Sequence, residues 1–234
     1  MFCLSGPPDS RVIVMEDDDV ILPCSLGTNQ NIEKELFVWK KEGTVPLKVV
    51  FMFDDGTYSR GQDEEFKGRV SHFPEQLKHG NASIRMNKTT LEDNGNYTCS
   101  FPEMKPTKIF RIELVVGAAP KPSVTNLYQT NDWALLQCDV EGASPKPTVE
   151  WWDSTNKTLT SDEPQVTPKG DRFYITVKTT VKKTGFYRCV ATQKEIWHQI
   201  HKEIYAHFGD RSGTGMMRAT IVSVIFGIIG IVVV

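Results

Sequence analysis

The feature that most constrains the fold is an arrangement of cysteine, tryptophan and tyrosine that occurs twice in the 234 residues. In the first copy, Cys24 is followed after 15 residues by Trp39 and after 75 residues by Cys99. Tyr97 lies two positions before the second cysteine. Side chains alternate between the two faces of a β-strand, so Tyr97 and Cys99 share a face. The set predicts a core in which the cysteines, the tryptophan and the tyrosine all point inward.

The second copy keeps the same order with a shorter spacing. Cys138 is followed after 13 residues by Trp151 and after 51 residues by Cys189, and Tyr187 lies two positions before that cysteine. Four cysteines allow three pairings. The repeat favours pairing the first cysteine of each copy with the second, which gives one disulfide per copy.

The geometry that accommodates such a set is the immunoglobulin sandwich, in which a disulfide joins two antiparallel sheets about 10 Å apart and a tryptophan packs on the sulfurs. The longer spacing leaves room for the nine strands of a variable-type domain, and the shorter one suits the seven strands of a constant type. We therefore predict an all-β chain of two tandem immunoglobulin sandwiches, variable type over residues 10–117 and constant type over residues 124–208. Residues 118–123 contain two prolines and form a semi-rigid linker.

Apolar and alternating runs give the expected strands. In the first domain they are residues 11–15, 19–25, 36–41, 47–53, 66–73, 81–87, 96–101 and 108–116. In the second domain they are residues 123–128, 133–140, 148–153, 172–181, 186–192 and 201–208.

One pair of opposite charges is expected to interact in the first domain. Arg69 lies in the expected strand 66–73, and Asp93 lies just before the strand that contains Cys99. We predict that they form the buried ion pair that closes the bottom of many variable domains. Two ordinary surface charges are the alternative.

The last sixteen positions, residues 219–234, contain no charged residue. A helix that spans a bilayer needs about 20 mostly apolar residues. We predict a transmembrane helix over residues 218–234 after a juxtamembrane stalk over residues 209–217. A cleaved lipid-anchor signal after the small residues 212–215 is the alternative.

The beginning of the chain carries a second targeting feature. Residues 1–6 resemble the end of a secretory signal peptide, which would remove Cys3, the fifth cysteine. A free thiol or an intermolecular disulfide at Cys3 is the alternative. Together the two ends predict a single-pass type I protein of the plasma membrane with an extracellular ectodomain.

Four triplets fit the rule for N-linked glycosylation, Asn-x-Ser/Thr. One triplet occurs often by chance, but four in a chain with paired cysteines and an apolar run favour secretion. The acceptors are Asn81, Asn87, Asn96 and Asn156.

Several function classes are excluded by charge and motif. A net charge of −2, from 27 basic and 29 acidic residues, is not that of a nucleic-acid binder. His198 and His201 are three apart, as two ligands on a helix would be, but the apolar residues around them fit an outer strand better. The acidic run 16–19 suits a solvated turn better than a calcium site. We predict no catalytic residue, no metal and no cofactor.

Longer motifs carry a resemblance to a known family. They are residues 22–24 (LPC), 38–41 (VWKK), 66–70 (FKGRV), 91–99 (LEDNGNYTC) and 147–154 (PTVEWWDS). With the domain order, they resemble the butyrophilin-like and B-seven costimulatory ligands of the immunoglobulin superfamily over about residues 10–234. One departure is Lys183, where many relatives have an acidic residue. The resemblance implies a cell-surface ligand that binds a receptor on a T cell or other leukocyte through the front sheet of its variable domain and modulates immune-cell activation.

The residues themselves point to the same sheet. Residues 49–53 are apolar without alternation, which indicates a face that is covered or that docks. The prolines of the loop 101–106 lower the entropy cost of ordering it. The predicted contact set is Val38, Lys40, Phe51, Phe53, Phe101, Met104, Lys105, Ile109 and Arg111. The alternatives are internal packing of several of these residues, or a homodimer through this face in a homophilic cell-adhesion glycoprotein.

Overall fold

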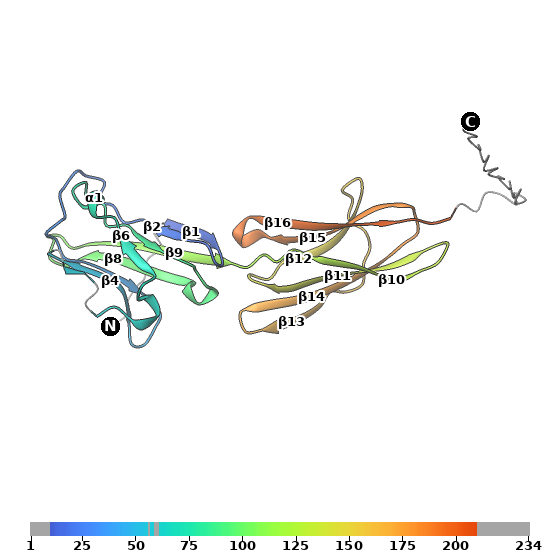
Figure 1. Ribbon diagram of the computed structural model, residues 1–234, viewed down its shortest axis with the longest axis horizontal. Helices are drawn as coiled ribbons and strands as arrows, with labels where there is room; N and C mark the ends of the chain where they lie inside the picture. Colours follow the sequence, from blue (N-terminus) through green and yellow to red (C-terminus); the bar gives the residue numbers. More distant parts are fainter. Residues whose placement is uncertain (1–9, 56, 59–60, 210–234) are drawn as a thin grey trace, which may run out of the picture.

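Two β-sandwiches lie end to end along the long axis of the molecule (Figure 1). The computed structural model describes residues 10–55, 57–58 and 61–209. The first sandwich contains strands β1 to β9, and the second contains strands β10 to β16. The all-β, two-sandwich prediction is confirmed for the described residues.

The first domain consists of a six-stranded and a three-stranded sheet. The larger sheet has the order β1-β9-β8-β3-β4-β5, and the smaller has the order β2-β7-β6. The strands are β1 (Ser10–Met15), β2 (Val20–Leu22), β3 (Phe37–Lys41), β4 (Lys48–Asp54), β5 (Thr57–Tyr58), β6 (Val70–His72), β7 (Ile84–Met86), β8 (Gly95–Phe101) and β9 (Lys108–Gly117). Strand β1 pairs with β9 in parallel, whereas the other pairs are antiparallel.

A disulfide and a tryptophan lie at the centre of this domain. Cys24 and Cys99 are bonded with 6.4 Å between their Cα atoms. Trp39 is fully buried, and its indole N–H donates to the carbonyl of Ala82 across the sandwich at 2.9 Å. The hydroxyl of Tyr97 donates to the carbonyl of Asp93 at 2.7 Å. These contacts satisfy the polar atoms that burial would otherwise leave unpaired.

The expected strand 66–73 is only half a strand. Its first part follows a short 3₁₀ helix, η1 (Glu64–Phe66), and pairing begins only at Val70. Gly68 has φ +72°, in the left-handed region that favours glycine, and this turn interrupts the extended backbone. Two further one-turn helices are α1 (Pro74–Leu77) and η2 (Leu91–Asp93).

The second domain consists of a four-stranded sheet, β10-β11-β14-β13, and a three-stranded sheet, β12-β15-β16. The strands are β10 (Ser123–Gln129), β11 (Ala134–Ala143), β12 (Thr148–Asp153), β13 (Gln165–Lys169), β14 (Arg172–Val181), β15 (Gly185–Gln193) and β16 (His198–Ala206), with a 3₁₀ turn η3 (Lys194–Ile196). Strand β13 was not predicted, because it lies at the sheet edge and its five residues, QVTPK, include a single large apolar side chain. The number of strands is the seven expected.

The core of the second domain repeats that of the first. Cys138 and Cys189 are bonded with 6.1 Å between their Cα atoms. Trp151 is fully buried and donates to the carbonyl of Val177 at 3.2 Å. The hydroxyl of Tyr187 donates to the carbonyl four residues earlier at 2.6 Å.

The linker begins with a residue that is held by both domains. The backbones of Ala118 and Ser144 exchange two hydrogen bonds, of 2.7 and 2.9 Å. The buried side-chain amide of Gln193 donates to the carbonyls of Ala118 and Pro145 at 3.0 and 2.7 Å. The domains are therefore joined by a small, ordered interface rather than by a free tether.

An ion pair crosses the same junction. The guanidinium of Arg172 contacts both carboxylate oxygens of Glu16, at 2.6 and 2.7 Å. This hydrogen bond raises the pKa of Arg172 above its usual value. Beside the pair, Ile196 packs so closely on Gly117 that a Cβ atom there would lie 2.6 Å from the isoleucine Cδ1. The contact between the domains therefore depends both on the packing of Ile196 against Gly117 and on the ion pair between Glu16 and Arg172.

Within the described ranges, no helix is long and apolar enough to cross a membrane. The predicted signal remnant with Cys3, most of the predicted stalk and the predicted transmembrane helix lie outside the described residues. They stay predictions.

We expect Arg172→Glu to loosen the junction, because it places two carboxylates face to face. A half-exposed pair stabilises by about 1 kcal/mol or less, so the amides of Ala118 and Ser144 should exchange with solvent roughly fivefold faster. Hydrogen exchange followed by mass spectrometry measures this rate. The double variant Glu16→Arg/Arg172→Glu restores the pair and should restore protection. If the single variant exchanges like the wild type, the ion pair does not hold the junction.

Candidate functional site

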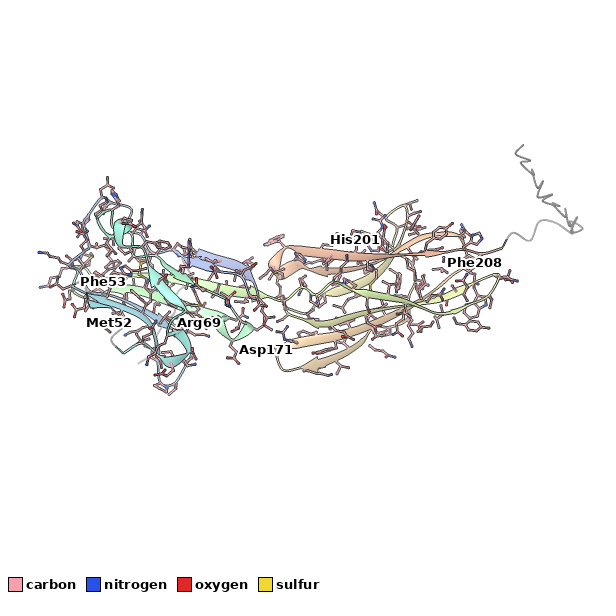
Figure 2. All side chains as sticks on the ribbon, viewed as in Figure 1. Met52, Phe53, Arg69, Asp171, His201 and Phe208 are labelled. Atoms are coloured by element: carbon pink, nitrogen blue, oxygen red, sulfur yellow. A yellow bond between two sulfur atoms is a disulfide. The ribbon has the colours of Figure 1, made fainter. Side chains whose placement is uncertain are left out.

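The six-stranded sheet of the first domain has one face on the core and one open face, which we call the outer face. Strand pairing arranges its side chains in rows. The row farthest from the second domain, the distal row, consists of Met52, Val38, Ser100 and Ile109 on strands β4, β3, β8 and β9. Figure 2 shows Met52 near the end of the molecule opposite Phe208.

A second row lies next to it toward the second domain. This middle row consists of Val49, Lys40, Thr98 and Arg111, again on four adjacent strands. The junction row follows, with Asn96 opposite Glu113 and an ion pair of 3.2 Å between Glu113 and Arg11. The outer face therefore changes from mainly apolar at its distal end to charged near the junction.

The assignment of Phe51 and Phe53 to this face is wrong. Trp39 pairs with Phe51, but the next residue, Lys40, pairs with Val49, so β4 contains a bulge. The bulge places Val50 and Phe51 together in the core. Both phenylalanine rings stack on Phe37 there. Residues 49–53 therefore fail to alternate because of the bulge, and not because both faces of this strand contact a partner.

Phe101 was also wrongly placed on the surface. It alternates with Tyr97 and Cys99 along β8 and is fully buried against Phe37. Met104, in the loop between β8 and β9, packs partly against the same core. Val38 does face outward, but only 6% of it is exposed, so it forms the floor of the distal row.

The remaining predicted contact residues lie at the surface. Lys105 and Ile109 are exposed, and Lys40 and Arg111 are half-buried. The prediction missed the outward residues Val49, Met52, Thr98 and Ser100. Thr98 and Ser100 flank Cys99, so strand parity alone indicates that they point outward. Met52 was missed because the uniformly apolar run 49–53 does not indicate which of its residues point outward.

Arg69 and Asp93 form an ion pair away from the outer face. Two guanidinium nitrogens contact the carboxylate at 2.5 and 3.3 Å, and the Asp93 side chain is 5% exposed. The same carboxylate accepts from the backbone N–H of Thr90 at 2.8 Å. Burial raises the pKa of the Tyr97 hydroxyl, which donates to Asp93, well above its usual value. This network braces the bottom of the sandwich.

The second domain has no matching ion pair at the equivalent place. The hydroxyl of Tyr187 meets the carbonyl of Lys183 directly, and burial again raises the tyrosine pKa. His198 and His201 lie on β16 with opposite parity, so they point to different sides of the strand. In the described part of the chain, no three histidine, cysteine or acidic side chains are grouped to hold a metal.

The four glycosylation triplets occupy different surfaces. Asn81 and Asn87 flank β7 in the three-stranded sheet, on the side opposite the outer face. Asn96 is exposed in the junction row. Asn156 is exposed in the turn after β12 of the second domain. None of them lies in the distal or middle row.

Comparisons with known proteins agree with this architecture. Residues 7–116 match the model of the immunoglobulin V-set domain, and residues 117–200 match that of the immunoglobulin I-set domain. Butyrophilin-like protein 1 of Mus musculus is 26% identical over 182 residues, which are 77% of this chain and 35% of that protein. The chain therefore consists of a V-set and an I-set immunoglobulin domain, and its relatives include butyrophilin-like proteins. Its second domain is I-set by this comparison, which corrects the constant-type assignment.

Two further similarities agree with this, one in sequence and one in fold. V-set domain-containing T-cell activation inhibitor 1 of Homo sapiens is 33% identical over 135 residues, which are 57% of this chain and 47% of that protein. A crystal structure of bovine butyrophilin superposes with a TM-score of 0.70 at 21% identity and covers 86% of this chain and 97% of that one. The chain thus spans less than half of the length of these curated relatives. The matched domain models and these relatives are those of non-enzymatic proteins of the immunoglobulin superfamily.

The register of β4 predicts losses of unequal size for two neighbouring residues. Phe53→Ala removes a buried ring and should lower the free energy of unfolding by about 3–5 kcal/mol. Met52→Ala removes a half-exposed side chain and should cost about 1 kcal/mol or less. Urea denaturation followed by tryptophan fluorescence measures both values. Equal losses for the two variants would contradict the assigned register of β4.

Proposed function

We propose that this chain is a cell-surface ligand that binds a protein receptor on T cells or other leukocytes and modulates their activation. The contact surface is the distal and middle rows of the outer face, together with the loop between β8 and β9. The observation that carries the proposal is the composition of the distal row, which contains no charge and ends in the exposed Ile109.

The two rows together have the anatomy of a protein interface. Binding surfaces combine an apolar centre, which excludes water, with a polar rim. Here Met52 and Ile109 supply apolar area over the buried floor of Val38. The rim is mainly basic, with Lys40, Lys105 and Arg111 beside the exposed Glu103. A receptor with an apolar patch between acidic side chains fits this surface.

The positions of the glycosylation triplets support the same surface. A glycan is bulky and solubilising, so a docking surface must be free of it. Asn81 and Asn87 lie on the other sheet, and Asn96 lies below the middle row. With all three sites occupied, the distal end of the outer face is the part of this sheet that stays accessible to a partner.

The names of the relatives favour a leukocyte as the cell that carries the receptor. One of them is named for inhibition of T-cell activation, and it is similar to this chain over 135 residues. The others are butyrophilins and a butyrophilin-like protein. These names concern those proteins, and they favour a leukocyte receptor as the partner in our proposal.

A pair of isoleucines provides a matched test. Ile109 on the outer face and Ile21 on the opposite sheet are 47% and 48% exposed. Ile109→Asp should weaken binding of the soluble two-domain protein to activated T cells at least tenfold, or about 1.4 kcal/mol, because it buries an unpaired charge at the interface. Ile21→Asp should bind like the wild type. Flow cytometry with labelled multimers measures both, and thermal unfolding controls for folding. If neither variant loses binding, or if both lose it equally, the outer face is not the contact surface for the receptor.

Homophilic adhesion predicts a different behaviour. A protein that pairs with itself through the outer face should sediment as a dimer at high concentration and become a monomer with Ile109→Asp. We expect a monomer for the wild type in analytical ultracentrifugation. A dimer that the substitution dissociates would replace the receptor proposal by the adhesion alternative.

A further inference from the structure

We infer that the end of the second domain farthest from the first, here called the tip, docks on the surface of a lipid bilayer. The inference rests on the cell-surface location in the proposed function, and it assigns a role to aromatic side chains that the outer face does not use. The docking holds the domain in a fixed orientation on the membrane instead of leaving it on a loose tether.

The first ring pair lies on the last rungs of the β15–β16 hairpin. Phe186 pairs with Tyr205, and the two ring centroids are 4.9 Å apart. Each side chain is 53% exposed. The ring of Tyr205 also stacks with that of His207, whose centroid is 6.5 Å away. Large apolar rings at half exposure on one edge mark a surface with a partner.

A second ring pair lies at the same end on the other sheet. Tyr128, which is 56% exposed, packs on Trp133 with 5.2 Å between centroids. The neighbouring Gln129 donates to the carbonyl of His207 at 2.6 Å, which joins β10 to the end of the chain described here. Figure 1 shows β10 and the end of β16 side by side where the chain leaves the second domain.

Basic side chains complete the tip. Lys182 and Lys183 are exposed in the turn between β14 and β15. The same turn holds the chain end in place, because the backbone N–H of Phe208 donates to the hydroxyl of Thr184 at 2.9 Å. The ammonium groups of these lysines can form charge-assisted hydrogen bonds with the phosphate groups of lipid headgroups. Tyrosine and tryptophan prefer the membrane–water interface, where one end of the ring is apolar and the other wet.

The sequence beyond the tip brings these rings within reach of lipid. Nine residues, 210–218, separate Gly209 from the uncharged run 219–234. Nine residues with random-coil dimensions would span about 17 Å on average. The headgroup layer itself is about 5–8 Å thick on each side of the hydrocarbon core. Contact between the tip and the headgroups therefore needs no extension of the spacer.

A bilayer fits the tip better than a second protein does. The two ring pairs belong to different sheets, so they surround the point where the chain leaves the domain instead of forming one flat patch. A flat protein partner would cover one pair only. A membrane lies across the exit point of its own anchored chain and meets both pairs at once.

The test uses the full chain in liposomes of phosphatidylcholine with about one fifth phosphatidylserine. Hydroxyl-radical footprinting compares Phe186, Tyr205 and Tyr128 before and after release of the two domains by a protease site placed in the spacer. Trp197, which is 86% exposed at the opposite end of the second domain, is the internal control. We expect the three rings to react at least about threefold faster after release, with no change at Trp197. Equal rates before and after release would overturn the docked tip.

A charge variant separates lipid from a second copy of the chain. Lys182→Glu/Lys183→Glu changes two exposed side chains and should reduce the protection of the rings in phosphatidylserine liposomes. If the protection of the rings is unchanged in this variant but decreases when the protein is diluted in the liposomes, the rings contact a second copy of the chain. That result would overturn the proposal. Binding to T cells through Ile109 is measured separately, so failure of the tip leaves the receptor proposal standing. A full chain that does not float with liposomes at all would reject both the cell-surface location and the tip.

Discussion

The structure of the first domain depends on the contact between its disulfide and Trp39. Trp39 on β3 pairs directly with Cys99 on β8, and Cys99 is bonded to Cys24 in the opposite half of the sandwich. This triangle fixes both the separation of the sheets and the facing of the two central strands. Every second residue on β3 and β8 must then point outward. The floor and centre of the distal row, Val38 and Ser100, follow from that constraint.

The bulge in β4 shows how one extra residue changes a surface. Without it, strand β4 would keep a single parity along its length. With it, Val50 and Phe51 both enter the core, and Val49 and Met52 form the outer edge. The core gains a stack of three phenylalanine rings, and the outer face keeps only modest apolar area. Strand β4 can therefore carry two phenylalanines, because both lie in the core. The exposed apolar area of the outer face stays too small to favour aggregation.

The sequence was sufficient for the features that depend on periodicity and failed where local geometry decides. Two cores, their disulfides and most strands were predictable, because cysteine, tryptophan and tyrosine recur with fixed parity. Gly68 interrupts the expected strand 66–73 by adopting φ +72°. The presence of a glycine in the sequence does not by itself predict that turn. The bulge in β4 lies in a uniformly apolar run, residues 49–53, in which no residue indicates the register shift. The contacts of Gln193 with the linker residue Ala118 and of Arg172 with Glu16 of the first domain join distant segments, and no local pattern encodes them.

The junction connects the two ends of the molecule mechanically. Ala118 is hydrogen-bonded on both its backbone groups to Ser144, and Arg172 clamps Glu16 beside it. A domain whose tip is docked on the bilayer has a fixed tilt, and an ordered junction passes that tilt to the outer face. A flexible junction would let the receptor-binding rows sample all directions, and each binding event would have to restrict them. The buried amide of Gln193 helps to order this junction, and in the proposed ligand such order would lower the entropy lost on binding a receptor.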